Sequence, residues 1–225
     1  MSALRLPVLI ILFPILFAAC GRSDLIRIRL LSPVSETKKD HSNFTDKTVS
    51  ASAKKITVAD PKTSGGGVYF LFKSIGLGYT TITTTIENEI RKSADDTLLL
   101  REKTTLVTNF TDIAFGIGEN YTLMWGAGVL AGGNLDTTLN YGYSGATDET
   151  LKHKELSGHS IFLVLAHHGF GFETLLGFRT NFIKGELEDS LSSATTLKTA
   201  NSISYESTGL RLTTNQVQLG IGVTF

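Results

Sequence analysis

The sequence predicts an all-β protein, an antiparallel transmembrane β-barrel of about eight strands. Three observations predict this fold: apolar residues alternate with polar or small ones, short turns alternate with long polar loops, and no long apolar segment follows the N-terminus. A transmembrane helix needs about 20 apolar residues in a row, whereas a tilted transmembrane strand needs only about 9–11 residues. The 225 residues of the chain suffice for one such barrel.

The last eleven residues, 215–225, show the alternation most clearly. Successive side chains of a strand point to opposite faces of a sheet. One face of this segment is therefore apolar and the other polar or small, as expected for a strand between lipid and a barrel lumen. The apolar face holds Val217, Leu219, Ile221, Val223 and Phe225, and the other face holds Gln216, Gln218, Gly220, Gly222 and Thr224.

The first 19 residues have the features of an export signal. Arg5 precedes a short apolar segment that two prolines interrupt, and Ala18 and Ala19 follow it. Such a segment is too short for a good spanning helix, so residues 1–19 are predicted to be a signal peptide. Cys20, the only cysteine, comes next. Residues 17–20 (Phe-Ala-Ala-Cys) resemble the bacterial lipobox, which implies a lipoprotein with Cys20 lipidated; the alternative is an ordinary signal peptide beside an incidental cysteine.

Residues 20–65 allow two interpretations. Residues 25–31 and 54–59 alternate like short strands, and the segment between them is rich in Ser, Thr, Lys and Asp. Either these two strands open the barrel and complete the eight, or the whole segment is a periplasmic tether between a lipidated Cys20 and a barrel over residues 66–225. We favour the tether. In both interpretations residues 60–67, which end in three glycines, form a turn or hinge.

From residue 68 the chain is organised in pairs of long strands, of which six are clear. Residues 68–86 are interpreted as one strand with a bulge near Lys73 that turns this cation away from lipid. Short periplasmic turns and long external loops are the expected arrangement in outer-membrane barrels, and Phe225 then lies on the side of the short turns. Short turns are predicted at 119–120 and 167–169, and long loops around 87–96, 144–157 and 186–200.

The closing strand, with its terminal Phe225 and apolar residues at alternate positions, resembles that of the small bacterial outer-membrane barrels of the OmpA/OmpW-like superfamily. The resemblance implies location in the bacterial outer membrane, contact with outer-membrane lipid, and recognition of the C-terminal strand by the barrel-assembly machinery. It also implies a structural role or a porin-like role in small-solute passage, without catalysis. Tyr121, Trp125 and Phe225 are candidates for the aromatic girdle at the membrane interface.

Three charged residues, Asp112, Glu173 and Arg179, fall on the parity that faces the lumen. Because buried charges must be paired, we expect a network of luminal salt bridges. Such a network either gates a narrow pore or fills a non-conducting interior. A barrel of about eight strands is just wide enough for side chains to fill it, which favours the filled interior.

No motif in the sequence predicts catalysis, a metal site or a cofactor. The His-Ser pairs at 41–42 and 159–160 and the His pair at 167–168 belong to no longer motif, and no spacing matches a metal site. A net charge of zero does not predict nucleic-acid binding. Two alternatives stay open: a lipid-modifying outer-membrane enzyme that uses His159, and a soluble periplasmic β-sandwich lipoprotein.

Overall fold

The computed structural model describes residues 26–42, 54–142, 148–187 and 210–225, and its elements within these ranges are all β-strands. They are β1 (Ile26–Ser42), β2 (Lys54–Val58), β3 (Lys62–Phe72), β4 (Ile75–Lys92), β5 (Leu98–Gly118), β6 (Tyr121–Tyr141), β7 (Glu149–Gly169), β8 (Phe172–Leu187) and β9 (Leu210–Thr224). Among the described residues, no helix is long and apolar enough to cross a membrane. The predicted signal peptide, residues 1–19, and Cys20 lie outside the described residues, so both remain predictions.

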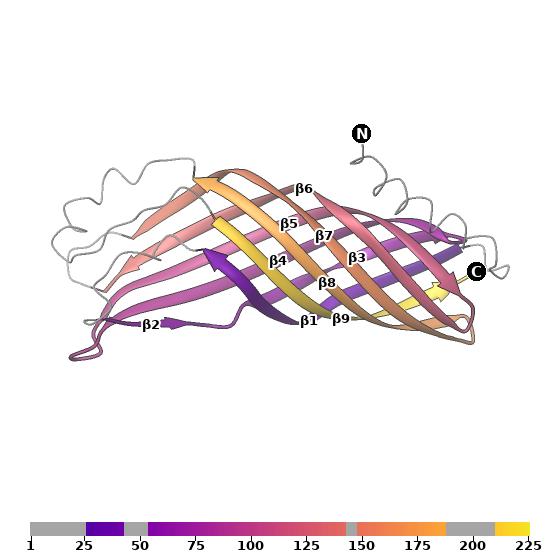
Figure 1. The fold of residues 1–225 in the computed structure, drawn as a ribbon, viewed down its shortest axis with the longest axis horizontal. Coiled ribbons are helices and arrows are strands. Elements are labelled where there is room, and N and C mark those ends of the chain that lie inside the picture. Colours follow the sequence, from indigo (N-terminus) through magenta and orange to yellow (C-terminus); the bar gives the residue numbers. More distant parts are fainter. Residues whose placement is uncertain (1–25, 43–53, 143–147, 188–209) are drawn as a thin grey trace, which may run out of the picture.

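Eight of these strands form a closed antiparallel barrel. Around the barrel the order is β1, β3, β4, β5, β6, β7, β8 and β9, and β9 pairs with β1 to close the sheet. The strands cross the long axis of the barrel obliquely (Figure 1), as closure of a sheet requires. The predicted fold class is therefore confirmed, and so is the count of eight strands.

One strand missing from the sequence-based count arises within residues 68–86. Phe72 pairs with Ile75, so Lys73 and Ser74 form a two-residue hairpin turn between β3 and β4. Lys73 has a φ of 55° and is exposed at this turn. The predicted single strand with a bulge is wrong: the chain reverses direction at Lys73, and the reversal itself takes the cation out of the apolar surface.

The other missing strand is β1, which pairs with β9 along almost its whole length and with β3 near its start. Residues 26–42 are therefore part of the barrel wall, and the tether interpretation is wrong for them. β2 pairs with β4 and continues the line of β3, after a break at Pro61, which has no N–H for the ladder. The hinge expected over residues 60–67 is also wrong, because Lys62–Gly67 pair with β4 as part of β3.

The barrel wall has a partly open seam between β1 and the line of β2 and β3. Within the described residues, β1 pairs with β3 only as far as Leu31 and Gly67, whereas its pairing with β9 continues to Ser42. Beyond that point side chains make the connection. The Ser32 hydroxyl donates to the carbonyl oxygen of Gly65 at 2.9 Å, and the Thr63 hydroxyl donates to the carboxylate of Glu36.

Three two-residue turns and the C-terminus lie at one end of the barrel, which we call the turn end (Figure 1). The predicted turn at Glu119–Asn120 is confirmed. The turn predicted at 167–169 is wrong, because β7 extends to Gly169 and the turn consists of Phe170 and Gly171. At the opposite end, the loop expected over 87–96 is largely strand, since β4 continues to Lys92 and β5 begins at Leu98.

The Phe170–Gly171 turn offers a stability prediction. Its φ angles of 55° and 83° match a hairpin turn of type I′, which Asn-Gly favours and a bulky residue at the first position does not. We expect Phe170→Asn to stabilise the barrel by about 1 kcal/mol, because left-handed backbone costs a non-glycine residue about that much and asparagine tolerates it better. Denaturant unfolding of the two proteins measures the difference, and a loss of stability would contradict the prediction.

Outward-facing apolar side chains surround the barrel next to the turn end, and we call this zone the apolar belt. Further from the turns, outward positions become polar, as in the series Thr81, Thr83 and Thr85 of β4. The change occurs within single strands, without a change in facing. Exposed members of the belt include Leu30, Val68, Phe70, Phe72, Ile75, Leu77, Ile113, Val129, Ile161, Leu163, Leu165, Phe172, Leu176, Phe178, Leu219 and Ile221.

Beyond the apolar belt the barrel is built in the opposite sense, with an apolar interior and a polar exterior. One interior cluster consists of Ile86, Leu106, Phe110, Leu135, Ile183 and Leu212. A second, nearer the end opposite the turns, consists of Ile90, Leu99, Leu100 and Leu139. This part of the wall therefore follows the pattern of a water-soluble barrel, in which burial of the luminal apolar surface stabilises the fold.

Candidate functional site: the charged centre of the lumen

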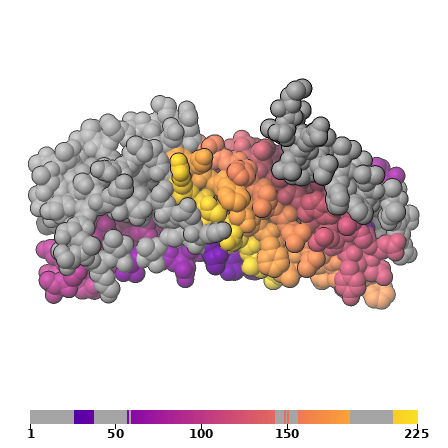
Figure 2. Space-filling model, viewed as in Figure 1, coloured from indigo at the N-terminus to yellow at the C-terminus, as the bar shows by residue number. Residues whose placement is uncertain are grey.

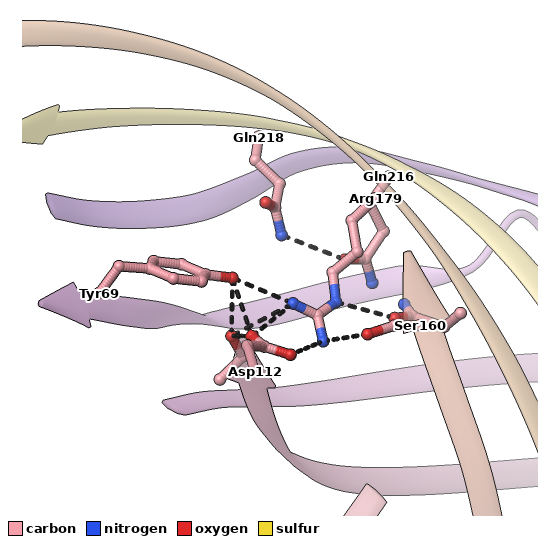
Figure 3. Close-up of polar contacts among 8 residues, drawn as sticks. Tyr69, Asp112, Ser160, Arg179, Gln216 and Gln218 are labelled. Atoms are coloured by element: carbon pink, nitrogen blue, oxygen red, sulfur yellow. Dashed lines mark hydrogen bonds and ion pairs between the residues drawn. The ribbon is translucent and has the colours of Figure 1, made fainter. Parts of the chain in front are cut away.

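The centre of the lumen holds a buried ion pair between Arg179 of β8 and Asp112 of β5. Both guanidinium ends reach the carboxylate, with Nη1 2.8 Å from Oδ2 and Nη2 2.9 Å from Oδ1. Both side chains are fully shielded from solvent. Strand alternation brings them together, since each occupies an inward position of its own strand (Figure 3). A bidentate ion pair between arginine and a carboxylate is among the stronger polar contacts available to a protein.

Neutral hydroxyls complete the surroundings of this pair. The Tyr69 and Thr80 hydroxyls donate to Oδ2 of Asp112 at 2.9 and 2.7 Å. Nη2 of Arg179 donates to the Ser160 hydroxyl at 2.6 Å. Figure 3 shows Tyr69, Asp112 and Ser160 around the guanidinium of Arg179. The charges are therefore well hydrogen-bonded, a condition for placing an ion pair in a low-dielectric interior.

Two aromatic rings lie against Arg179. Its guanidinium carbon is 4.7 Å from the ring centre of Phe110 and 5.5 Å from that of Phe162. Rings at these distances attract a cation electrostatically. They also occupy luminal space that water would need in an open pore, so the ion pair is enclosed as well as paired.

A second buried ion pair lies closer to the turn end. Arg29 of β1 donates from Nε and Nη2 to the two carboxylate oxygens of Glu173 of β8, at 2.6 and 2.7 Å. Nearby, Nη1 of Arg27 donates to the Thr122 hydroxyl at 3.1 Å. The three charged residues that sequence parity assigns to the lumen thus lie there, but in two separate pairs. Sequence reasoning missed Arg29, because its segment was favoured as a tether.

Glu36 of β1 forms a third polar centre, on the side of the seam. Its buried carboxylate accepts hydrogen bonds from three neutral groups: the hydroxyls of Thr63 and Thr84 and the side-chain amide of Gln216. These donors come from β3, β4 and β9, so one side chain connects the two edges of the seam. The alternation of Arg27, Arg29 and Leu31 would place Glu36 on the outer face, and it is the β-bulge between Pro33 and Ser35 that turns Glu36 inward. Strand parity in the sequence therefore gives no signal for this residue.

Apolar layers lie on both sides of the central ion pair. Towards the turn end the layer contains Leu31, Leu71, Met124, Val164 and Leu175, and all of these side chains are buried. Towards the opposite end lies the cluster around Phe110 and Leu106. The lumen is therefore occupied by alternating polar and apolar layers, which is consistent with a small barrel whose interior is filled by side chains.

The candidate girdle residues all lie near the turn end. Tyr121 starts β6 and is exposed, with its ring 4.9 Å from that of His167. Trp125 faces outward within the apolar belt, 6.3 Å from the ring of Phe115. Phe225 is exposed beside the turns, and its backbone N–H donates to the carbonyl of Ile26 at 2.9 Å. The places of Tyr121 and Phe225 beside the turns suit aromatic residues at a membrane interface. Trp125 pairs with Leu163 and so lies deeper in the apolar belt than the predicted girdle.

Three histidines, His159, His167 and His168, belong to β7. His159 faces outward and stacks on Phe182 at 4.8 Å. His167 and His168 end β7 on opposite faces, and Nδ1 of His168 lies 3.3 Å from the Thr224 hydroxyl. No group of three potential metal ligands occurs in the described part of the chain.

An exposed charge cluster marks the end opposite the turns. Arg101 of β5 donates to Glu89 of β4 at 2.7 Å, and Arg91 donates to the same carboxylate at 3.0 Å. These hydrogen bonds, from Arg101 first and Arg91 second, lower the pKa of Glu89 below its ordinary value. The cluster lies outside the apolar belt, where β4 connects to β5. It stabilises this end of the barrel only weakly, because exposed ion pairs contribute little to the free energy of folding.

The closed wall, the apolar belt and the filled lumen together define a small transmembrane β-barrel of the bacterial outer-membrane type. No protein-family model and no curated protein sequence matches the chain.

Three of the solved structures that are similar to this chain are outer-membrane proteins. The outer membrane protein OprG from Pseudomonas aeruginosa has 12% sequence identity and a TM-score of 0.41, and the match covers 91% of this chain and 98% of OprG. Neisserial surface protein A has 10% identity and a TM-score of 0.43, and the match covers 92% of this chain and 100% of that protein. The outer membrane protease OmpT from Escherichia coli has 11% identity and a TM-score of 0.45, and the match covers 92% of this chain and 100% of OmpT. The strand pairing described above establishes the fold, and no role or ligand is transferred from these proteins.

Proposed function

We propose that the protein is a structural, non-conducting β-barrel of the bacterial outer membrane. The observation that carries this proposal is the filled lumen, in which the Arg179–Asp112 pair lies between two apolar layers. The apolar belt supports the membrane location, because an apolar surface around a closed barrel has lipid as its natural contact. Outer-membrane lipid is therefore the principal partner in this proposal.

The layered interior opposes axial passage of ions and polar solutes. A hydrated ion has to cross the layer around Leu71 and Met124 and the layer around Phe110, and neither offers polar replacement for its water shell. It also has to pass Arg179 and Asp112, whose hydrogen bonds already use their charged atoms. Opening a path would require breaking this buried pair, which is strongly unfavourable.

Two measurements test the proposal together. Detergent-extracted protein is expected to migrate faster on a gel before boiling than after it, as a closed barrel does, and to fractionate with the outer membrane. In planar lipid bilayers the same preparation is expected to give no discrete conductance steps. Steady channel openings from a preparation that shows the band shift would overturn the non-conducting role. A soluble protein without a band shift would overturn the barrel in the membrane.

We also propose that the barrel is not an enzyme. His159, the most suggestive residue for lipid modification, faces outward and stacks on the ring of Phe182. We expect His159→Gln to leave the lipid A composition of the producing cells unchanged, measured by mass spectrometry against cells without the protein. A lipid A species that depends on the wild-type protein and disappears with this variant would establish catalysis.

The C-terminal strand is the part that we propose the barrel-assembly machinery recognises. Its outward face presents Leu219, Ile221 and Phe225, all exposed. Replacement of Phe225 by Ala is expected to lower the amount of assembled, heat-modifiable barrel in the outer membrane more than it lowers the stability of barrel that has already assembled. Equal levels of assembled wild type and variant in cells would contradict this recognition.

A further inference from the structure

The outer wall has a hollow across β8, β9 and β1, at the edge of the apolar belt furthest from the turns. Its volume is about 240 Å³, and the residues lining it include Ser35, Thr37, Phe178, Thr180, Asn215 and Val217. In Figure 2 orange β8 and yellow β9 lie side by side, with indigo β1 next to β9. The hollow is thus a feature of the barrel exterior, separate from the charged centre of the lumen.

The strand register arranges the lining of this hollow in two rows across the three strands. The first row consists of Phe178, Val217 and Ser35. The second row, two residues further from the turn end, consists of Thr180, Asn215 and Thr37. The ring of Phe178 is 46% exposed and belongs to the apolar belt. The hollow therefore has an apolar side towards the belt and a side of hydroxyl and amide groups away from it.

The outer face of the hollow is uncharged, as far as the described residues that line it are concerned. Arg179 also contributes to the lining, but its guanidinium points inward and is bound to Asp112. The lining therefore offers no counter-charge to a phosphate or to an ammonium group. Hydroxyls both donate and accept hydrogen bonds, so the hydroxyls of Ser35, Thr37 and Thr180 suit a ligand that is itself rich in hydroxyls.

The side chain of Asn215 is oriented for such a ligand. Its Oδ1 accepts a hydrogen bond from the Thr180 hydroxyl at 2.9 Å. Since the oxygen and the nitrogen of an amide point in different directions, this contact on the β8 side turns the NH₂ group towards β1, where Thr37 is paired with Asn215. The NH₂ group then presents its two hydrogens as donors, and it can bind a ligand hydroxyl without rearrangement.

The exposed ring of Phe178 adds a flat apolar surface beside these polar groups. The face of an aromatic ring is electrically negative and attracts positively polarised groups. The C–H groups on one face of a sugar ring are of this kind, whereas the sugar hydroxyls project from its edge. A sugar that lies on Phe178 can therefore direct hydroxyls to Asn215 and Thr37. A second hollow, of about 440 Å³ and lined in part by Phe182, follows along the same strands and leaves room for further sugar units.

We propose that this hollow binds the uncharged sugar headgroup of a glycolipid in the adjacent leaflet, with the sugar ring on Phe178 and its hydroxyls on Asn215 and Thr180. Position selects a lipid over a free sugar. On the turn side of Phe178 lie Leu176 and Leu219, two paired and exposed residues of the apolar belt along which acyl chains can continue. The inference rests on the proposed membrane location and adds a specific lipid site to it.

The test measures glycolipid binding to the intact barrel. The wild type is reconstituted in phosphatidylcholine nanodiscs with rising fractions of a diglucosyl diacylglycerol, and the backbone amide NMR signals at positions 37, 180 and 215 are followed. We expect these signals to shift saturably. We expect half-saturation to need about tenfold more glycolipid in the double variant Phe178→Leu/Asn215→Ala, because the ring surface and the amide donors are lost. Thr180→Ser retains the hydroxyl and is expected to retain binding, whereas Thr180→Val is expected to weaken it.

The strands β4 and β5 supply a matched control. Tyr79, Thr81 and Asn109 form a similar outward set at the edge of the belt, and they line neither of the two hollows. The double variant Tyr79→Leu/Asn109→Ala is therefore expected to bind the glycolipid like the wild type. Equal weakening in the two double variants would reduce the effect to a general property of the barrel surface and overturn the proposal.

Further arms separate the possible ligands. Phosphatidylglycerol with the same acyl chains is expected to cause no saturable shift; shifts equal to those with the glycolipid would reduce the hollow to a general lipid contact and overturn the sugar site. Free maltose as effective as the glycolipid would overturn the choice of a lipid. Each variant is checked for the band shift on heating. If the wild type lacks this shift, the proposed membrane location fails, whereas a normal shift with unaltered glycolipid binding in Phe178→Leu/Asn215→Ala overturns only the hollow.

Discussion

Replacing Arg179 by methionine is expected to destabilise the barrel by about 3–5 kcal/mol, because it leaves the buried Asp112 carboxylate without its counter-charge. The cost is large since both side chains are fully shielded from solvent and the pair is joined at two points. Unfolding in denaturant, followed through the fluorescence of Trp125, the only tryptophan, measures the difference in the free energy of unfolding.

Two control variants separate the charge effect from lost packing. In the double variant Arg179→Met/Asp112→Leu no charge stays buried, and most of the lost stability is expected to return, since apolar replacements of a whole buried pair are often neutral. Arg101→Met breaks the exposed contact with Glu89 and is expected to cost less than about 1 kcal/mol. A single variant as stable as the wild type would mean that water reaches Asp112, and the lumen would then have to be regarded as open.

An arginine in the middle of the apolar belt is expected to destabilise the membrane-embedded barrel by about 2–4 kcal/mol. Leu163 of β7 is a suitable position, because it faces outward between Ile161 and Leu165, two other exposed apolar residues. The variant Leu163→Arg moves a cation into hydrocarbon without touching the lumen. Reversible unfolding in lipid vesicles measures the effect.

The matched control for this prediction is Thr83→Arg, at an outward position of β4 beyond the belt. There the side chain meets water or headgroups, and a change of about 0–1 kcal/mol is expected. Equal, small effects at both positions would mean that the belt does not contact lipid. The apolar belt would then have to be covered by protein, as in the soluble alternative.

Strand parity was sufficient to predict the inward position of the luminal charges. Asp112, Glu173 and Arg179 each occur in a strand with a clear apolar face, so the opposite face is assigned without knowing the fold. Strand parity could not predict which residues these charges pair with. Pairing depends on which strands meet across the lumen, and Glu173 meets Arg29, a residue of the N-terminal segment 144 positions away.

The turns were harder to predict than the strands. Lys73-Ser74 and Phe170-Gly171 lack the Asn-Gly or Asp-Gly signature of two-residue hairpins, yet Lys73 and Phe170 both adopt positive φ. Tertiary pairing of the long strands decides the conformation there. Residues 160–166 posed the converse problem, since both of their faces are apolar: Phe162 and Val164 fill a luminal layer while Leu163 and Leu165 face outward.

The reversal of polarity along the wall determines how far the protein extends from a membrane. β5 and β6 contain 21 residues each, which corresponds to a barrel height of roughly 50 Å at about 3.3 Å per residue and the usual strand tilt. Hydrocarbon accounts for only about 25 Å of this height. The remaining half carries its own apolar interior, so it holds its shape in water and keeps the strand ends about 25 Å beyond the hydrocarbon. A water-soluble macromolecule can therefore reach those ends without entering the hydrocarbon.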